Sequence, residues 1–411
     1  MVSAERQWFD GLSSKGIRPG LEAMSVLLED LGSPQSGMRA IHVAGSDGKG
    51  STCCMLESIL LSAGYRTGMF TSPHIISVNE CIRVDGEEIS DDDLDSCIRE
   101  VRESSERTGC DCTSFEALTL CAFLYFRKKS VDIAIIEVGM GGRLDATNVV
   151  DSVVTVINNI GLEHQAYLGD SIEEIASEKA GIMKPGIPCV TMNSGKALEV
   201  IEQRSEDLGC PLICVCPEDI QIVESSADHI SMRYCCKNYR IGLPGEFQSR
   251  NAALAIEAVK SLPDSKKIEQ FIAIGLDSAS WPCRMQKLDG YPIVLDVTHT
   301  RKGAECLSAD IGRIYGKVVL VTGMLSDKDL DGVAETLSKI ATKVFVSSPD
   351  SPRAADKDEL AACYRRFHND VRVFDTIGEA VETALKDDDI ILVTGSFRTA
   401  EDCLRWLRRT R

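Results

Sequence analysis

The sequence predicts an α/β fold in which mostly parallel sheets are covered by helices on both faces. The first observation is a series of continuous apolar runs rich in Val and Ile, which is typical of strands buried on both faces. The second is that amphipathic helical stretches separate these runs. The third is that glycine-rich or acidic turns follow several of the runs, at the strand ends where parallel sheets bind ligands.

The predicted strands form two groups along the 411-residue chain. The first group comprises residues 40–45, 131–139, 152–160 and 187–192, and the second comprises 291–297, 317–324, 343–348 and 389–396. Between the two groups, residues 215–245 alternate with period two. This alternation predicts a small antiparallel sheet inserted between the parallel ones.

A domain boundary is predicted in the stretch 278–292. This stretch lacks a helical period and contains three residues that favour turns, Pro282, Gly290 and Pro292. A chain of this length is also too long for one ordinary hydrophobic core. We therefore predict a larger N-terminal domain at 1–285 and a smaller, Rossmann-like C-terminal α/β domain at 290–411.

The composition limits the partners. The formal net charge of −18 repels nucleic acid and anionic membranes, so we expect neither as a partner. No uninterrupted apolar run reaches the roughly 18 residues of a membrane span, and the first residues lack an apolar signal segment. We expect a cytoplasmic monomer that acts on small molecules.

Seventeen cysteines are an unusually high number for such a chain. Without a secretory signal, reduced thiols are expected rather than a framework of disulfides. One grouping has metal-like spacing and consists of Cys210, Cys214 and Cys216. It lacks a second Cys-x-x-Cys half, so we do not predict a metal there.

The segment "GSDGKGST" after the first strand predicts a phosphate-binding loop that opens a helix. Glycines let backbone N–H groups turn inward, and the helix N-terminus adds a favourable dipole. Lys49 supplies a charge for the β- and γ-phosphates, and Ser51 or Thr52 supplies a hydroxyl for Mg²⁺. The common nucleotidase loop has Ser or Thr directly after the lysine, whereas Gly50 intervenes here. The ATP-binding residues predicted in this loop are Gly45, Asp47, Gly48, Lys49, Gly50, Ser51 and Thr52.

Glu137 ends an apolar strand, where a carboxylate is poorly tolerated unless it is paired or bound to metal. We interpret it as a Mg²⁺ ligand, with an ion pair to Arg143 as the structural alternative. His164 follows another strand end, and Lys179 lies on a helix rich in glutamate. From the residues alone, His164 is more often structural than a ligand, and Lys179 is an ordinary ion-pair partner within its helix.

Four polar residues flank the predicted boundary, namely Asn251, Arg284, Asp296 and His299. Asp296 ends a buried strand and so repeats the pattern of Glu137. Clefts between domains favour ligand sites. An acid, a base and an arginine there could clamp a nucleotide.

Ordered motifs along nearly the whole chain resemble one family. They include "GIRPGLEAM", "HVAGSDGKGST", "TSPH", "EVGMGGRLDATN", "EKAGIMKPG", "WPCRMQ", "DVTHTRKGA" and "VTGSF". With these motifs the sequence is similar to the folylpolyglutamate synthase/dihydrofolate synthase family of the Mur ligase superfamily. The resemblance implies an N-terminal P-loop ATPase domain followed by a C-terminal ligase domain.

The resemblance also implies roles for individual residues. The loop at 48–51 would bind the ATP phosphates, and Lys179 matches a lysine that is carbamylated in such ligases. One or two Mg²⁺ ions would be held by Ser51, Ser72, Glu137, His164 and Lys179. The nucleotide would also contact Asn251, Arg284 and Asp296, with His299 at the position of a catalytic histidine. The acceptor side would comprise Gly20, Leu21, His74, Arg83, Phe115 and Leu144.

The implied reaction is the ATP-dependent addition of L-glutamate to a pterin-type carboxylate through an acyl phosphate, with ADP and phosphate released. The acceptor would be dihydropteroate, a reduced folate that already carries glutamate, or both. Several motifs depart from the family pattern, among them Ser46-Asp47 in the loop and the segment "THTR" at 298–301. Three alternatives therefore stay open: a related ligase for another coenzyme acid, a P-loop phosphotransferase, and a ligase-like binding protein without turnover.

Overall fold

The computed structural model describes residues 3–410, which form two compact units. The first unit comprises the chain up to Ile220 together with Arg250–Ala279, and the second comprises Gln221–Ser249 together with the chain from Ser280. The predicted outer ends at residues 1 and 411 lie outside the described residues.

The first unit is built on an eight-stranded sheet with the order β4-β3-β2-β5-β1-β6-β7-β8. The six strands from β2 to β8 in this order are parallel, and β3 and β4 are antiparallel additions at one edge. The strands are β1 Ala40–Ala44, β2 Thr67–Phe70, β3 Ile82–Val84, β4 Glu87–Glu88, β5 Ile133–Glu137, β6 Ser152–Ile157, β7 Cys189–Thr191 and β8 Leu212–Cys214. The four strands predicted for this part of the chain are therefore confirmed as β1, β5, β6 and β7.

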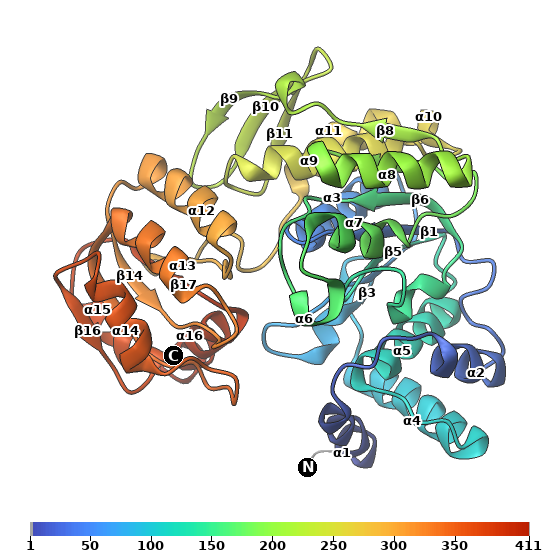
Figure 1. Ribbon diagram of the computed structural model, residues 1–411, viewed down its shortest axis with the longest axis horizontal. Helices are drawn as coiled ribbons and strands as arrows, with labels where there is room; N and C mark the ends of the chain where they lie inside the picture. Colours follow the sequence, from blue (N-terminus) through green and yellow to red (C-terminus); the bar gives the residue numbers. More distant parts are fainter. Residues whose placement is uncertain (1–2, 411) are drawn as a thin grey trace. The chain divides into compact units, whose positions relative to one another are not determined.

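Helices cover both faces of this sheet. They are α1 Ala4–Gly11, α2 Glu22–Asp30, α3 Lys49–Ser62, α4 Asp91–Thr108, α5 Ser114–Lys129, α6 Gln165–Leu168, α7 Ile172–Ala180, α8 Gly195–Leu208, α9 Phe247–Lys260, α10 Ser265–Ile268 and α11 Ile272–Ser278. Short 3-10 turns are η1 Leu12–Lys15, η2 Val78–Cys81, η3 Ala146–Val149, η4 Pro217–Asp219 and η5 Glu269–Phe271. Helices α1, α2, α4 and α5 gather at one end of the unit (Figure 1).

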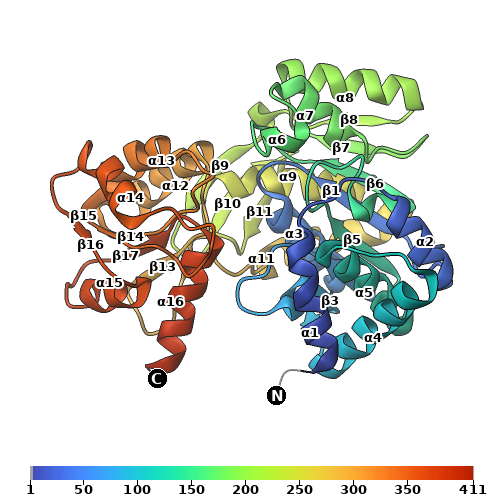
Figure 2. The ribbon, with the colours of Figure 1, turned by 60° about the horizontal axis from the view of Figure 1, so that its bottom comes forward.

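Helix α3 is the central helix of the first unit and is buried along most of its length. It packs on β1, β2 and β5, and α11 lies beside it (Figure 2). Gly275 of α11 makes this approach possible, because a Cβ there would collide with the backbone of Ile59. The Ser58 hydroxyl donates to the Gly275 carbonyl (2.7 Å) and so fixes the two helices together. The loop before α3 is thereby mounted on a rigid element.

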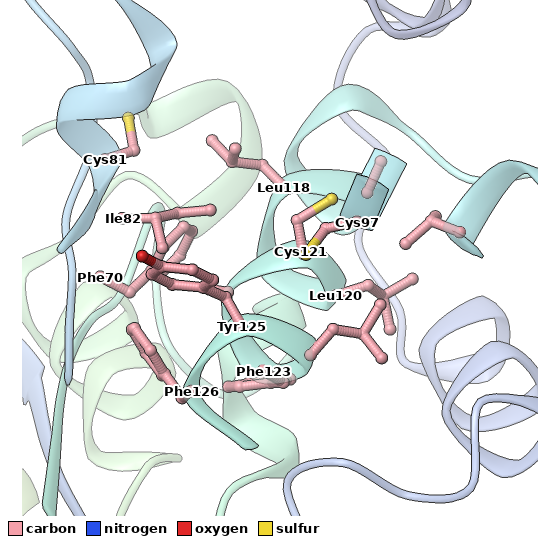
Figure 3. Close-up of a cluster of buried hydrophobic side chains, with 14 of the residues drawn as sticks. Phe70, Cys81, Ile82, Cys97, Leu118, Leu120, Cys121, Phe123, Tyr125 and Phe126 are labelled. Carbon is pink, nitrogen blue, oxygen red and sulfur yellow. The ribbon is translucent and has the colours of Figure 1, made fainter. Parts of the chain in front are cut away.

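The core between α4, α5 and the sheet contains many of the cysteines. Phe70, Phe123 and Phe126 belong to the same buried cluster as Cys97 and Cys121 (Figure 3). Burial raises the pKa of Cys97 to about 11, so the thiol stays protonated and unreactive. All 17 cysteines lie within the described residues and are free thiols, as predicted.

The second unit contains two sheets. The six-stranded sheet has the order β12-β13-β17-β14-β15-β16 and is parallel except for β12. Its strands are β12 Gln286–Lys287, β13 Ile293–Leu295, β14 Val318–Thr322, β15 Ala341–Val346, β16 Val371–Val373 and β17 Ile391–Thr394. Its helices are α12 Arg301–Ile314, α13 Leu330–Leu337, α14 Lys357–Arg365, α15 Ile377–Ala384 and α16 Phe397–Arg409, with the 3-10 turn η6 Ser338–Ile340. The predicted C-terminal α/β fold is thus confirmed.

The second sheet of this unit is antiparallel, as the alternation of residues 215–245 predicted. It consists of β9 Gln221–Ser225, β10 Ile230–Tyr234 and β11 Lys237–Ile241, which the sequence placed in the N-terminal domain. The segment after β11 is bonded to α12, since the Glu246 N–H donates to Asp310 Oδ2 (3.0 Å) and the Glu246 carboxylate pairs with Arg313. In the division into compact units, residues 221–249 belong to the second unit, and the chain returns to that unit after Ala279, within the predicted boundary stretch 278–292.

We expect Asp264→Asn to destabilise the first unit. Asp264 accepts both guanidinium N–H groups of Arg39 (3.1 and 2.7 Å) and the Tyr65 hydroxyl (2.5 Å). The Arg39 bond is the largest influence holding the pKa of Asp264 down at about 2. The expected loss at pH 7 is about 1 kcal/mol, or about 2–4 °C in Tm.

The pH dependence of this effect has a definite sign. A carboxyl whose folded pKa is depressed stabilises the protein above its unfolded pKa near 4. That contribution disappears as the pH falls from about 4 through about 2, so the wild type and the variant should converge in this window. Thermal unfolding at pH 7 and pH 3 measures the difference. The exposed Asp207→Asn of α8 serves as the control.

Candidate active site

The predicted phosphate loop connects β1 to α3. Gly48 has φ 86° and caps the helix, and a Cβ there would collide with the Asn251 side chain. Gly45 has φ 149°, and a Cβ there would collide with Asn158. Both positions therefore require glycine, and the helix N-terminus is left open to an anion.

The loop is supported by the chain segment that follows β6. The Ser46 N–H donates to the Asn159 carbonyl (2.7 Å), and the Ser46 hydroxyl exchanges hydrogen bonds with Gly161 (3.0 and 3.2 Å). Behind the loop, the Asn158 amide donates to Thr52 Oγ1 (2.8 Å) and to Asn251 Oδ1 (3.2 Å). This support gives the loop a fixed shape before any ligand is bound.

The ammonium group of Lys49 folds back over the loop. Its Nζ donates to the carbonyls of Gly45 (3.0 Å) and Ser46 (3.4 Å). A phosphate with its own negative charge is a stronger acceptor than these carbonyls. Lys49 can therefore transfer its hydrogen bonds to the phosphates of a bound nucleotide without a large movement.

Glu137 lies at the carboxyl end of β5, next to the phosphate loop. It pairs in register with Val43 of β1 and has 4 % of its surface exposed. The Ser72 N–H donates to Glu137 Oε2 (3.4 Å), so the structure brings together two of the predicted Mg²⁺ ligands. The alternative partner, Arg143, instead forms an ion pair with Glu178 (2.7 Å).

Lys179 is almost completely buried, with 1 % of its side chain exposed, and pairs with Glu163 (Nζ to Oε1, 2.6 Å). The sequence alone suggested a partner within the same helix. In the structure the partner comes instead from the loop after β6. Burial tends to raise the pKa of Glu163, but Lys179 and Lys49 outweigh it and lower the pKa to about 2. Burial lowers the pKa of Lys179, while Glu163 counteracts that shift. His164, next to Glu163, is exposed and has φ 46°.

The acceptor-side residues are partly brought together. The Gly20 N–H donates to the Leu144 carbonyl (3.3 Å), which joins two of the predicted residues. The Phe115 ring lies against Phe70 (5.8 Å between centroids) and against Gly139, where a Cβ would collide with it. Leu21 caps the start of α2 and directly follows Gly20.

Arg83 and His74 lie in different surroundings. Arg83 is on β3 and forms a long ion pair with Glu88 (3.6 Å). It also lies near the buried Glu57 of α3, whose pKa burial raises to about 7 against the opposing charge of Arg83. His74 is in the loop between β2 and η2, two residues after Ser72.

The second unit holds the remaining predicted residues in a compact group at the strand ends. Asp296 is 2 % exposed and accepts the backbone N–H groups of Met285 (3.0 Å) and Thr298 (2.8 Å). The Arg284 guanidinium lies over the Phe397 ring (5.4 Å), and the His299 ring lies 6.3 Å from it. Phe397 was not predicted as a site residue, although it ends the quoted motif "VTGSF".

Comparison with known proteins gives this arrangement a family. The profile of the Mur ligase middle domain matches residues 43–259, and that of the Mur ligase glutamate ligase domain matches residues 283–397. A curated Bacillus subtilis protein named dihydrofolate synthase/folylpolyglutamate synthase is 35% identical over 98% of both chains. The chain belongs to the folylpolyglutamate synthase/dihydrofolate synthase family.

Solved structures of this family share the fold. A Mycobacterium tuberculosis folylpolyglutamate synthase complexed with ADP and AMPPCP superposes with a TM-score of 0.87 at 30% identity, covering 98% of each chain. Escherichia coli FolC in complex with DHPP and ADP gives a TM-score of 0.87 at 30% identity, covering 100% of this chain and 99% of that one. The fold class and the enzyme class predicted from the sequence, an ATP-dependent ligase that forms C–N bonds, are confirmed.

Within the described residues, the structure contains few side chains that could hold the Mg²⁺ ion implied by the family. Across residues 3–410 no three side chains of His, Cys, Asp or Glu are gathered as a metal site, and this includes the Cys210, Cys214 and Cys216 grouping. Mg²⁺ in nucleotide sites needs only one or two carboxylates, because phosphates and water complete its shell. Glu137 and the hydroxyls at the loop fit that requirement. The same described residues contain no helix long and apolar enough to cross a bilayer.

Because the resemblance places Arg284 at a nucleotide contact, we expect Phe397→Leu to weaken ATP binding. The Arg284 guanidinium lies over the Phe397 ring, and such a cation–π contact contributes about 0.5–2 kcal/mol. The KM for ATP should rise about 3–10-fold, with a smaller change in kcat. Phe374→Leu is a matched control, because Phe374 is equally half-buried and packs on Phe345 (5.0 Å) elsewhere in the unit. An unchanged KM for ATP would show that the ring does not position Arg284.

Proposed function

We propose that this enzyme uses ATP to join L-glutamate to a folate-type carboxylate, either dihydropteroate, a reduced folate that already carries glutamate, or both. The observation that carries the proposal is the arrangement within the first unit. The phosphate loop, Glu137 and the Lys179–Glu163 pair lie at neighbouring strand ends, and the loop at 139–148 carries the acceptor-side residue Leu144.

Relatives support this substrate class. The solved Escherichia coli FolC carries DHPP and ADP, and another bifunctional folylpolyglutamate synthase/dihydrofolate synthase was solved with Mn, AMPPNP and L-glutamate bound. A curated Lacticaseibacillus casei relative, 34% identical over 91% of each chain, is named folylpolyglutamate synthase. The proposed substrates combine what these proteins bind with what their names state.

The reaction has two steps. A carboxylate oxygen of the acceptor attacks the γ-phosphorus of ATP, and the bond to the ADP oxygen breaks, which gives an acyl phosphate. The amine of glutamate then attacks the acyl carbon, phosphate leaves, and the amine loses a proton to give the amide. Mg²⁺ neutralises phosphate charge when it is bound.

The residues of this chain prepare the first step. The loop N–H groups and Lys49 hold the β- and γ-phosphates, and Glu137 with Ser51 and Ser72 holds the metal ion. We assign Asn251, Arg284 and Asp296 to nucleotide contacts, as the resemblance implies. We also assign a catalytic role to His299, which the resemblance places at the position of a catalytic histidine.

Lys179 is proposed to be carbamylated in the active enzyme. Carbamylation needs a neutral amine, which attacks CO₂ and loses a proton, and burial of Lys179 favours that neutral form. The carbamate would supply oxygen donors for a second Mg²⁺, for which the resemblance also names His164 as a ligand. An ammonium group at this position would instead repel the ion.

We also propose a cytoplasmic monomer with no nucleic acid or membrane partner.

The decisive experiment is an assay of ADP release. Purified enzyme with Mg-ATP and glutamate should respond to dihydropteroate or to tetrahydrofolate, and mass spectrometry should detect the glutamylated product. No response to either acceptor, with turnover on another carboxylic acid, would overturn the proposed acceptor class. Turnover of ATP without any amino acid would favour a phosphotransferase instead.

A further inference from the structure

The loop at 139–148 rests directly on the C-terminal end of α7, the helix that carries Lys179. The Arg143 N–H donates to the Glu178 carbonyl (2.8 Å), and the Arg143 guanidinium pairs with the Glu178 carboxylate (2.7 Å). Gly142 lies so close that a Cβ there would be 2.8 Å from the Glu178 oxygen and 3.0 Å from the Lys179 oxygen. The loop and the helix end therefore touch through backbone atoms.

Asn148 joins the same two segments from the other side. Its amide nitrogen donates to the carbonyls of Arg143 (3.0 Å) and Gly181 (3.1 Å). Lys184 donates to both the Asn148 side-chain oxygen (2.9 Å) and the Asn148 backbone carbonyl (3.0 Å). Asn148 is 9 % exposed, so these bonds form in a site with little competing water.

The loop is also anchored to the central sheet. Asp145 accepts the Met140 and Thr147 N–H groups (2.9 and 3.0 Å) and the Thr147 hydroxyl (2.5 Å). The Thr147 oxygen lies 2.8 Å from Nε2 of the buried His42 on β1. Because the hydroxyl hydrogen is directed to the carboxylate, His42 must donate from Nε2. The loop is thus held at β1 by one set of bonds and at α7 by another.

The segment between these anchors carries the acceptor side of the site. Leu144 lies between Arg143 and Asp145, and its carbonyl accepts the Gly20 N–H. A displacement of Leu144 by a bound acceptor would therefore be transmitted through Arg143 and Asn148 to the backbone around Lys179. The path consists of directional hydrogen bonds between rigid elements, which have few alternative arrangements.

We propose that Asn148 and Lys184 are positioning residues that couple the acceptor loop to Lys179. The inference rests on the proposed function and names two residues that touch neither the nucleotide loop nor the predicted metal donors. The coupling orients Lys179 only when the acceptor loop is in place. Loss of the coupling should impair acceptor binding and turnover, and should leave ATP binding intact.

The test uses the full-length enzyme in the ADP-release assay. For Asn148→Ala and for Lys184→Met we expect the KM for the acceptor to rise about tenfold and kcat to fall about tenfold, with the KM for ATP within about twofold of the wild type. Lys184→Arg, which can still donate to both oxygens, should restore most of the loss. Lys196→Met is the matched control. Lys196 of α8 forms an exposed pair with Glu173 in the first turn of α7, at the opposite end of that helix from Lys179.

A second variant separates coupling from general instability. Gly142→Ala keeps every polar group of the network but places a methyl group against the Glu178 and Lys179 carbonyls, so the loop must move away from α7. It should reproduce the rise in acceptor KM and the fall in kcat. Thermal unfolding measured on each variant verifies that it is folded under the assay conditions.

The possible outcomes distinguish the two proposals. An active wild type whose Asn148, Lys184 and Gly142 variants keep their acceptor KM and kcat within about twofold would overturn the coupling alone. An equal rise in the KM for ATP, or no recovery in Lys184→Arg, would also overturn it. A wild type that turns over no pterin acceptor would overturn the proposed function and the coupling together.

Discussion

Lys49→Ala is expected to abolish ATP-dependent ligation, with kcat/KM reduced at least about 1,000-fold. The chain carries a net charge of −18, and the carboxylates of Glu137 and Glu163 lie near the phosphate loop. A triphosphate entering this field needs a fixed positive charge, which Lys49 provides from the first turn of α3. The measurement is ADP release in the presence of glutamate and the acceptor, together with titration of ADP binding.

The pattern of residual function separates the competing roles of Lys49. Lys49→Arg should recover a small part of the activity, because a guanidinium restores the charge but not the compact geometry of the ammonium group. Lys128→Ala on α5 removes a lysine that pairs with Glu100 on the surface and should leave turnover unchanged. If Lys49→Ala retained full turnover, the loop would not be the site of phosphoryl transfer.

The central strands could be predicted because both of their faces are buried. Strands β1, β5 and β6 are continuous apolar runs, and their register brings Val43 beside both Glu137 and Val156. Such runs leave few alternatives to a central parallel strand. The glycine-rich turn after β1 then places the phosphate loop without any long-range information.

The short strand β2 and the unit to which the antiparallel sheet belongs could not be predicted in the same way. Strand β2 has only four residues, and Gly68 in it lies against the Phe126 ring, a contact that the local sequence does not show. The antiparallel strands β9–β11 were recognised from their alternation. Their assignment to the second unit depends on contacts such as Glu246 with Arg313, between residues 67 positions apart.

In the site, too, some residues could be predicted from the local sequence, whereas others depend on contacts between distant parts of the chain. Glu137 and Asp296 were found because a carboxylate at the end of an apolar strand is unusual. Asn158 directly follows β6 and could have been found by extending that rule to polar amide side chains. The pairing of Lys179 with Glu163 joins residues 16 positions apart, and the helix around Lys179 offered three nearer glutamates. Only the fold decides among these partners.

Lys179→Ala is expected to lower kcat at least about 100-fold, and the way in which activity is rescued should reveal the chemical form of Lys179. The wild-type side chain is 1 % exposed, so the variant leaves a cavity at the site of the lost group. If Lys179 acts as a carbamate, formate can enter the cavity and replace its two oxygens. If it acts as an ammonium group, methylamine should rescue the variant and formate should not.

Lys179→Ala is also expected to lower the stability of the protein, apart from its effect on the chemistry. For the unmodified lysine, removing the side chain leaves the Glu163 carboxylate without its partner, which costs about 3 kcal/mol for a pair buried to this extent. The double variant Glu163→Gln/Lys179→Ala removes that unpaired charge and should recover most of the thermal stability. Formate rescue that appears in Lys179→Ala and is absent from Lys49→Ala would assign the effect to the position of Lys179. Rescue by methylamine alone would contradict carbamylation, because a cation at this position cannot supply oxygen donors to a second metal ion.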